Sequence, residues 1–91
     1  MLANDLTKYT ETTVKYIINE RDPLGLLAGG APEDEFKNEI KKIIVLLSKV
    51  ETVSQLAEGI ATIFTNAFDR PYSKEDYMET AQKIWIALER T

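Results

Sequence analysis

The side chains with most chemical potential in this chain are four carboxylates in one short stretch: Glu33, Asp34, Glu35 and Glu39. Glu35 and Glu39 are four residues apart, so on a helix they lie one turn from each other on the same face. Together with Asp34 or Asp22 they could share a magnesium or calcium ion, because such ions prefer oxygen ligands. Two close carboxylates could also divide acid and base roles between them.

The same cluster has a simpler structural explanation, which we favour. Pro32 suits the first position of a helix, and acids in the turn that follows stabilise the positive end of the helix dipole. The spacing of a calcium-binding loop is absent, and Lys37, Lys41 and Lys42 are placed to neutralise the same face. The sequence therefore predicts a helix start here, with a carboxylate-based metal-binding protein or enzyme as the alternative.

An apolar loop, DPLGLLAGGAP, precedes the acids in residues 22–32. Loops are usually polar, whereas this one carries Leu24, Leu26 and Leu27. In one interpretation Leu24 and Leu27 close the open end of a helical core. In the other, Leu26 and Leu27 are exposed beside the acids and form an apolar spot with a charged rim, as partner sites do.

The composition excludes several classes of chemistry. The 91 residues include no cysteine and no histidine, so zinc sites built on these residues, disulfides and histidine-activated nucleophiles cannot form. The net charge of −4 disfavours binding to nucleic-acid phosphates, and the loop glycines lack the lysine of a phosphate-binding motif. No apolar run approaches the roughly 20 residues that span a bilayer, and no signal peptide is evident. We expect no cofactor, no membrane association and a cytoplasmic location.

The elements that position these residues follow from hydrophobic periodicity. Apolar residues recur every three or four positions in four segments, which cover residues 2–20, 32–50, 52–68 and 73–88. No segment alternates apolar and polar residues with the period of a strand. A chain of this length suits one hydrophobic core. We therefore predict a single all-α domain over residues 1–91, a four-helix bundle with a Gly/Pro-rich apolar loop between its first and second helices.

Local signals mark the last two helices. Thr52 and Gln55 form a capping-box pattern that opens the third helix, and Ser73 with Asp76 opens the fourth. Gly59 lies inside the third helix, where glycine is unfavourable, so we expect a close crossing with a neighbouring helix at this point.

Tyrosines occur at two informative pairs of positions. Tyr72 and Tyr77 occupy the hydrophobic-staple positions around the start of the fourth helix. Tyr9 and Tyr16 are seven residues apart and share a face of the first helix, in the apolar stripe that also includes Leu2, Leu6 and Ile17. An exposed Tyr16 would favour a binding interface, because tyrosine is enriched at binding hot spots.

Residues 22–27 (DPLGLL) and 30–36 (GAPEDEF) resemble the YugE-like proteins, a small family of Bacillus and related bacteria. The pattern of that family is D-P-[IL]-G-L, a spacer and G-A-P-x-D-E-[YF], then an acid, here Glu39, and apolar helix positions. The likeness extends over residues 14–88, with Arg21 where relatives often carry a bulky aromatic residue. The resemblance implies an all-helical domain, and it carries over no activity because the family has none assigned.

We therefore expect a non-catalytic protein that binds another protein, with an acidic surface suited to a basic partner. The predicted partner-binding residues are Asp22, Leu24, Leu26, Leu27, Asp34, Glu35 and Glu39. An immunity-type inhibitor of a basic toxin is one version, suggested by the resemblance, since relatives can lie near toxin–immunity loci. Besides the metal-dependent alternative, a structural homodimer would bury the leucine loop against its twin.

Overall fold

Four segments of the chain form helices where the hydrophobic periodicity predicts them. The computed structural model describes residues 2–89, with side chains from Lys8 onward. Within this range the α-helices are α1 (Leu2–Arg21), α2 (Lys37–Leu47), α3 (Val53–Phe68) and α4 (Met78–Ala87). There are also two 3₁₀ turns: η1 (Pro23–Gly25) follows α1, and η2 (Lys74–Tyr77) precedes α4. The described residues contain no strand, so the prediction of an all-α four-helix bundle is confirmed.

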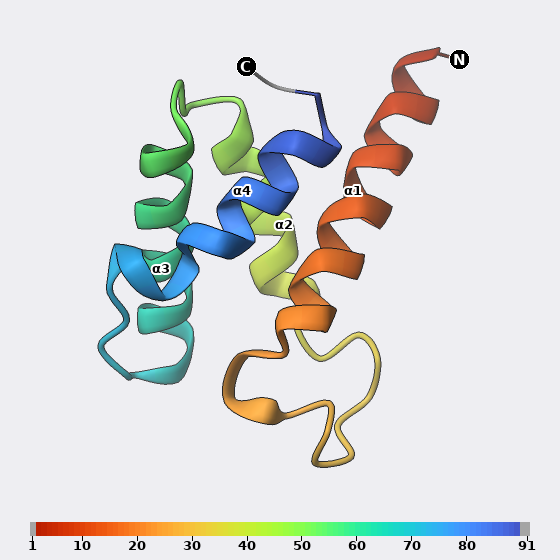
Figure 1. Ribbon diagram of the computed structural model, residues 1–91. Coiled ribbons are helices and arrows are strands. Elements are labelled where there is room, and N and C mark those ends of the chain that lie inside the picture. Colours follow the sequence, from red (N-terminus) through yellow and green to blue (C-terminus); the bar gives the residue numbers. More distant parts are fainter. Residues whose placement is uncertain (1, 90–91) are drawn as a thin grey trace.

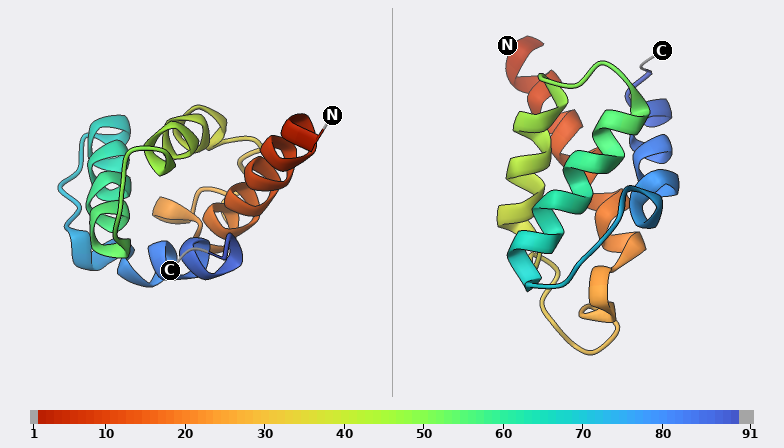
Figure 2. Two further views of the ribbon diagram at one scale, coloured as in Figure 1. Left: turned by 90° about the horizontal axis from the view of Figure 1, so that it is seen from above. Right: turned by 90° about the vertical axis from the view of Figure 1, so that its left-hand side faces the viewer.

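The helices are arranged as a ring in which each packs against two neighbours. α1 contacts α2, α2 contacts α3, α3 contacts α4, and α4 returns to α1, as the view from above in Figure 2 shows. α1 begins and α4 ends at one end of the bundle, whereas the connection between α1 and α2 closes the other end (Figure 1). None of the described helices combines the length and apolarity needed to cross a membrane.

The core fills the centre of this ring, and an aromatic cluster closes it beside the α1–α2 connection. The largest fully buried side chains are Tyr77, Phe36, Phe64, Ile18, Ile43, Leu56, Ile60, Ile84 and Val14. The Phe64 ring stacks on Tyr77, with centroids 5.3 Å apart, and meets Phe36 edge-on at 5.9 Å. Such pairs gain energy beyond simple area burial, so they fix the point at which the chain enters α2.

The predicted cap is present at the start of α3, whereas the one predicted to open the fourth helix lies at the 3₁₀ turn η2, and α4 itself begins at Met78. The Gln55 amide donates to Thr52 Oγ1 at 3.1 Å, and Gln55 Oε1 accepts from the Glu51 amide at 2.7 Å. At the start of η2 the Ser73 amide donates to Asp76 Oδ2 at 2.8 Å. These bonds give partners to the Gln55 amide in the first turn of α3, and to the Glu51 and Ser73 amides that lie just outside the helical residues.

The start of the second helix differs from the prediction. α2 begins at Lys37, five residues after Pro32. The Glu35 amide donates to the Pro32 carbonyl at 3.0 Å and the Lys37 amide to the Asp34 carbonyl at 3.1 Å, so residues 33–36 form turns. The backbone of Phe36 is not helical (φ −98°, ψ 20°), and its ring is fully buried. The helix therefore begins only after Phe36. Glu33, Asp34 and Glu35 precede α2 instead of forming its first turn, in which Glu39 is the acidic residue.

The buried face of α1 also differs. Val14 and Ile18 are fully buried and Ile17 nearly so, whereas Tyr9 and Tyr16 are exposed. At about 100° per residue, both tyrosines lie on the opposite side of the helix from Val14 and Ile18. The predicted stripe therefore combined a residue of the buried face, Ile17, with the exposed Tyr9 and Tyr16. The side chains of its first members, Leu2 and Leu6, lie outside the described residues.

Candidate functional site

The loop between α1 and α2 is organised by its first residue, Asp22. Its Oδ1 accepts a hydrogen bond from the Leu27 amide at 2.8 Å, and its Oδ2 accepts one from the Ala28 amide at 3.0 Å. Asp22 and Leu24 have left-handed backbones, with φ of 50° and 63°. This conformation is unfavourable for residues with a Cβ, so the two bonds and the buried Pro23 must hold it. Both Asp22 oxygens are thus used inside the loop, and contact with a partner stays a prediction.

The three loop leucines have different environments. Leu26 and Leu27 are half-buried and pack against the core, whereas the side chain of Leu24 is 38% exposed. The plug that we expected from Leu24 and Leu27 is therefore made by Leu26 and Leu27. Leu26 and Leu27 are thus not the fully exposed residues of the alternative, because the turn held by Asp22 directs them toward the core; their contact with a partner stays a prediction. Leu24 is the loop leucine most accessible to a partner.

The acids do not converge on a common point. Glu33, Asp34 and Glu35 are exposed, and Glu39 is half-buried on α2. Throughout the part of the chain that the structure describes, no three carboxylates lie close enough together to hold a metal ion. The set of Asp22, Asp34, Glu35 and Glu39 considered as metal ligands is thus spread over a loop, a turn and a helix. The geometry offers residues 33–35 as an exposed acidic segment, which we call the acidic segment.

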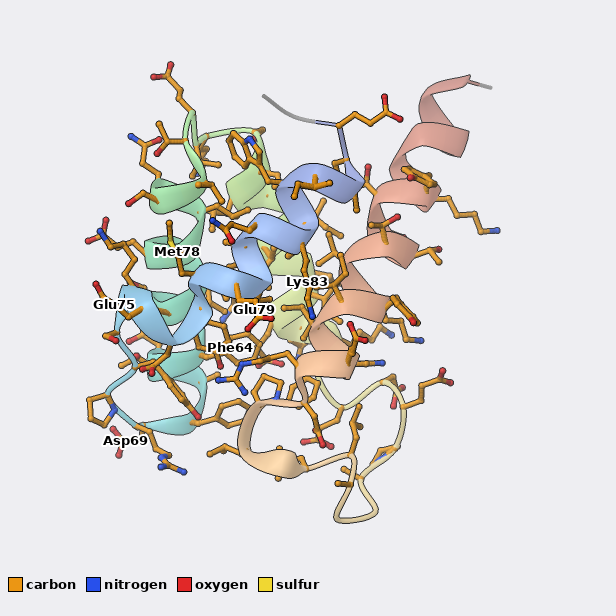
Figure 3. All side chains as sticks on the ribbon, viewed as in Figure 1. Phe64, Asp69, Glu75, Met78, Glu79 and Lys83 are labelled. Carbon is orange, nitrogen blue, oxygen red and sulfur yellow. The ribbon has the colours of Figure 1, made fainter. Side chains whose placement is uncertain are left out.

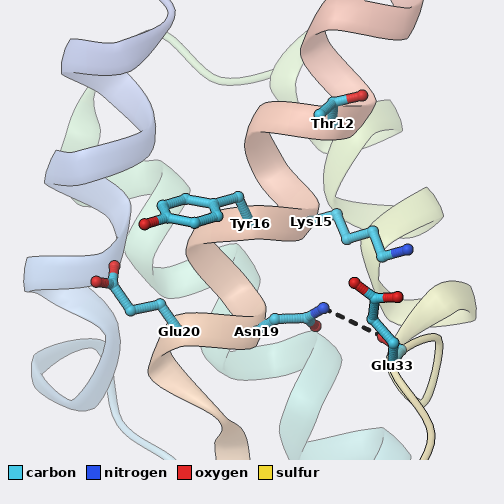
Figure 4. Close-up of a pocket in the computed structure, with 6 residues that line it drawn as sticks. All are labelled: Thr12, Lys15, Tyr16, Asn19, Glu20 and Glu33. Carbon is cyan, nitrogen blue, oxygen red and sulfur yellow. Dashed lines mark hydrogen bonds between the residues drawn. The ribbon is translucent and has the colours of Figure 1, made fainter.

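A hollow of about 570 Å³ lies between the outer face of α1 and the acidic segment; we call it the α1 hollow. Its lining comprises Thr12, Lys15, Tyr16, Asn19, Glu20 and Glu33. Asn19 Nδ2 donates to the Glu33 carbonyl at 3.1 Å and so ties the loop to α1. Figure 4 shows this bond, with the Lys15 and Glu33 side chains pointing toward one another. The Tyr16 ring lies at the edge of the hollow and is 69% exposed.

Charges of both signs surround the α1 hollow, with acids in excess. A smaller hollow of about 230 Å³ adjoins it and shares Lys15, with Asp34, Lys37 and Ile40 as its other lining residues. The two hollows together present three carboxylates and two ammonium groups, and the exposed Glu35 follows Asp34 directly. A surface of this kind can orient a charged partner and bury an aromatic ring.

Beside the α1 hollow, α4 adds side chains that the sequence reasoning did not single out. Lys83 lies 3.8 Å from Glu20 and 4.0 Å from Glu79; Figure 3 labels Lys83 and Glu79 on α4. Tyr9 donates a hydrogen bond to the Ala87 carbonyl at 3.2 Å. Ile86 is 73% exposed on the same helix as Lys83. The seven-residue spacing of Tyr9 and Tyr16 was the available sequence signal for this face, whereas nothing local distinguished Ile86 from a core residue.

One buried polar group is not explained by this surface. The Tyr77 hydroxyl is fully buried and has no hydrogen-bond partner among the described residues. Burial raises the pKa of Tyr77 to about 12, although the nearby Arg21, whose Cζ lies 5.0 Å from the ring centroid, acts in the opposite direction. A phenol with a raised pKa donates its proton less readily. Tyr77 is therefore a packing residue and not an activated acid.

Comparison with known proteins gives no match among protein-family models, curated proteins or solved structures. The similarity of residues 22–27 and 30–36 to the YugE-like proteins therefore stays a prediction.

Proposed function

We propose that this protein is a non-catalytic binding module whose docking surface joins the α1 hollow to the acidic segment. The observation that carries the proposal is the exposed Tyr16 ring at the edge of a hollow rimmed by Glu20 and Glu33. Tyrosine combines a large apolar area with a hydroxyl and loses little entropy when it is immobilised, so it is common at the centre of interfaces.

The partner that fits this surface is a protein with a basic patch. Glu20, Glu33, Asp34 and Glu35 outnumber Lys15 and Lys37 around the two hollows, and the whole chain carries a net charge of −4. Long-range attraction would accelerate encounter with such a partner and weaken as salt rises. An immunity-type inhibitor of a basic toxin is the concrete version of this proposal.

Two alternatives receive less support. A metal-dependent role would need carboxylates that converge, and those described do not. A homodimer built on the leucine loop would need exposed leucines, but Leu26 and Leu27 are already packed against the core of their own chain. Leu24 alone supplies too little apolar area for a stable dimer, which normally buries well over 1,000 Å².

Affinity capture from a lysate of the source organism, followed by mass spectrometry, tests the proposal. The baits are the wild-type protein, Tyr16→Ala and Glu33→Lys. Tyr9→Ala and Glu58→Lys serve as matched controls, since both residues are exposed and neither lines the α1 hollow. We expect a basic protein that the wild type and both controls retain and that the two hollow variants lose. Equal capture by all five baits, or no specific capture by the wild type, would contradict the proposal.

A further inference from the structure

A second surface lies on a different pair of helices. α2 and α3 run side by side in opposite directions (Figure 2). Between them is a groove of about 330 Å³, which we call the α2–α3 groove. Its walls include Lys42, Val45 and Leu46 from α2, Lys49 from the turn that follows α2, and Gly59 and Ile63 from α3. None of these residues belongs to the α1 hollow or to the acidic segment.

Three residues of the groove lie on one face of α2. Positions 42, 45 and 46 are spaced by three and one residues, which places their side chains on the same side of a helix. Lys49 lies in the turn that follows α2, where its amide donates to the Leu46 carbonyl at 2.8 Å. Two lysines therefore precede and follow the apolar residues Val45 and Leu46 along the chain.

Gly59 allows the Leu46 side chain of α2 to pack closely on α3 at the bottom of the groove. A Cβ added at Gly59 would lie 2.4 Å from Leu46 Cδ2 and 2.9 Å from Leu46 Cδ1. The Leu46 side chain therefore lies directly over the α3 backbone, as expected for the close crossing that Gly59 predicted. Next to it, Val45 is 56% exposed. The result is an apolar strip between two helices, open to the outside.

The lysines at the groove are exposed and accessible to the carboxylates of a partner. In the part of the chain with described side chains, neither Lys42 nor Lys49 forms an ion pair. A second copy of the chain is a poor occupant, because a symmetric dimer across the groove would place the two lysine rows against each other.

We propose that the α2–α3 groove docks an amphipathic helical segment of a partner protein. That segment has an apolar stripe and two acidic residues seven positions apart. Its apolar stripe would cover Val45, Leu46 and Ile63 while its carboxylates pair with Lys42 and Lys49, so that the three helices pack side by side. The inference is independent of the function proposed for the α1 hollow, since the two surfaces share no residue and favour partners of opposite charge.

Designed peptides test this inference directly. One labelled 18-residue helical peptide carries leucines on one face and glutamates seven positions apart, and its twin carries lysines in place of the glutamates. Fluorescence anisotropy measures the binding of each peptide to the wild type, to Lys42→Glu/Lys49→Glu and to Lys41→Glu/Lys74→Glu. The last variant is the matched control, with the same change of charge at exposed lysines that do not line the groove.

We expect the wild type to prefer the acidic peptide, and the groove variant to bind that peptide about tenfold more weakly and to prefer the basic twin. The control variant should keep the wild-type preference. In addition, Val45→Asp should weaken binding of both peptides by removing the apolar contact. Circular dichroism verifies that each variant is folded, which is expected because all the substituted side chains are exposed.

Equal binding of the two peptides by the wild type, or equal losses in the groove and control variants, would overturn the inference. Binding to phosphatidylglycerol vesicles without binding to the acidic peptide would overturn it in favour of a membrane surface. Amide chemical shifts locate the contact. We expect changes at residues 42–49 and 59–63, whereas changes confined to the α1 hollow would refute this inference and leave the proposed function intact.

Discussion

Among the individual residues, Tyr77 has the most unusual environment. Its ring stacks on Phe64 and meets Tyr72 edge-on, while the Arg21 guanidinium lies over its face. These contacts bury an aromatic ring at the centre of the cluster that closes the core. The buried hydroxyl adds no hydrogen bond to another described residue, so the ring and not the hydroxyl stabilises the fold at this position.

The environment of Tyr77 predicts a loss of stability in alkali. Its pKa of about 12 in the folded chain exceeds the ordinary value of 10.0, so the unfolded chain releases this proton first as the pH rises. The stabilisation that this difference in pKa gives the folded chain is complete below pH 10. It is lost between pH 10 and 12, which lowers the free energy of unfolding by about 3 kcal/mol in total. Urea unfolding of the wild type and Tyr77→Phe across this range measures the difference.

In Tyr77→Phe the decrease in the free energy of unfolding that Tyr77 causes between pH 10 and 12 should disappear. At neutral pH its free energy of unfolding should equal or exceed the wild-type value by up to about 1 kcal/mol, since an unpaired buried hydroxyl is removed. Tyr72→Phe is the control, because it keeps the Tyr77 phenol and should keep the alkaline loss. An identical pH dependence in the wild type and Tyr77→Phe would show that Tyr77 does not titrate in this way.

Among the connecting elements, the loop from α1 to α2 depends on Asp22. In Asp22→Ala, two hydrogen bonds to a carboxylate are lost and a left-handed backbone loses its support. We expect the free energy of unfolding to fall by about 2 kcal/mol. The amides of Leu27 and Ala28 should exchange with solvent faster. Thermal or urea unfolding and amide exchange measure both effects.

Asp34→Ala is the matched control for Asp22→Ala. Asp34 is exposed, and no hydrogen bond of its carboxylate is found among the described residues, so its replacement should change stability by less than about 0.5 kcal/mol. If the two variants were equally stable, the loop would not depend on the carboxylate of Asp22.

The close crossing of α2 and α3 predicts that substitutions at Gly59 and Leu46 are energetically coupled, which a double-mutant cycle tests. Gly59→Ala should destabilise the protein by about 1 kcal/mol, because the new Cβ displaces the Leu46 side chain. In the Leu46→Ala background the same substitution should stabilise it by about 1 kcal/mol, since only the gain in helix propensity remains. Urea unfolding of the four proteins measures the coupling, and additive effects would contradict the close contact.

The whole molecule is a ring of four helices around a closed core, and large apolar residues are exposed on several of its elements. Among the described side chains these are Tyr9, Tyr16, Leu24, Val45 and Ile86. They come from α1, the loop, α2 and α4, so no one helix presents them all. Obligate dimers bury large and predominantly apolar interfaces.

We therefore expect the isolated protein to be a monomer. Light scattering at protein concentrations up to about 0.1 mM should give the mass of one chain, at low and at high salt. A dimer that persists in high salt would contradict this expectation and would favour the homodimer alternative. A dimer found only at low salt would point instead to pairing of the acidic segment with the lysines of the α2–α3 groove.

Where the sequence interpretation failed, the reason lies in contacts between distant segments. Residues 33–36 form turns instead of the first part of a helix because the Phe36 ring packs against Phe64 and Phe68, which are about thirty positions away. The exposure of Tyr16 depends on which side of α1 meets α2 and α4. A pattern read along one segment contains no information about which of two apolar faces a neighbour will cover.

The amino-acid sequence by itself determined the helices, the capped starts at Thr52 and Ser73, the tight crossing at Gly59 and the absence of thiol and imidazole chemistry. These features depend on residue type or on neighbours within one helical turn. Only the tertiary structure decided that Leu26 and Leu27 face the core, that Tyr16 borders a hollow, and that Lys42 and Lys49 flank an open groove. Each of these depends on how separate helices pack, because burial is a property of the assembled core and not of any one segment.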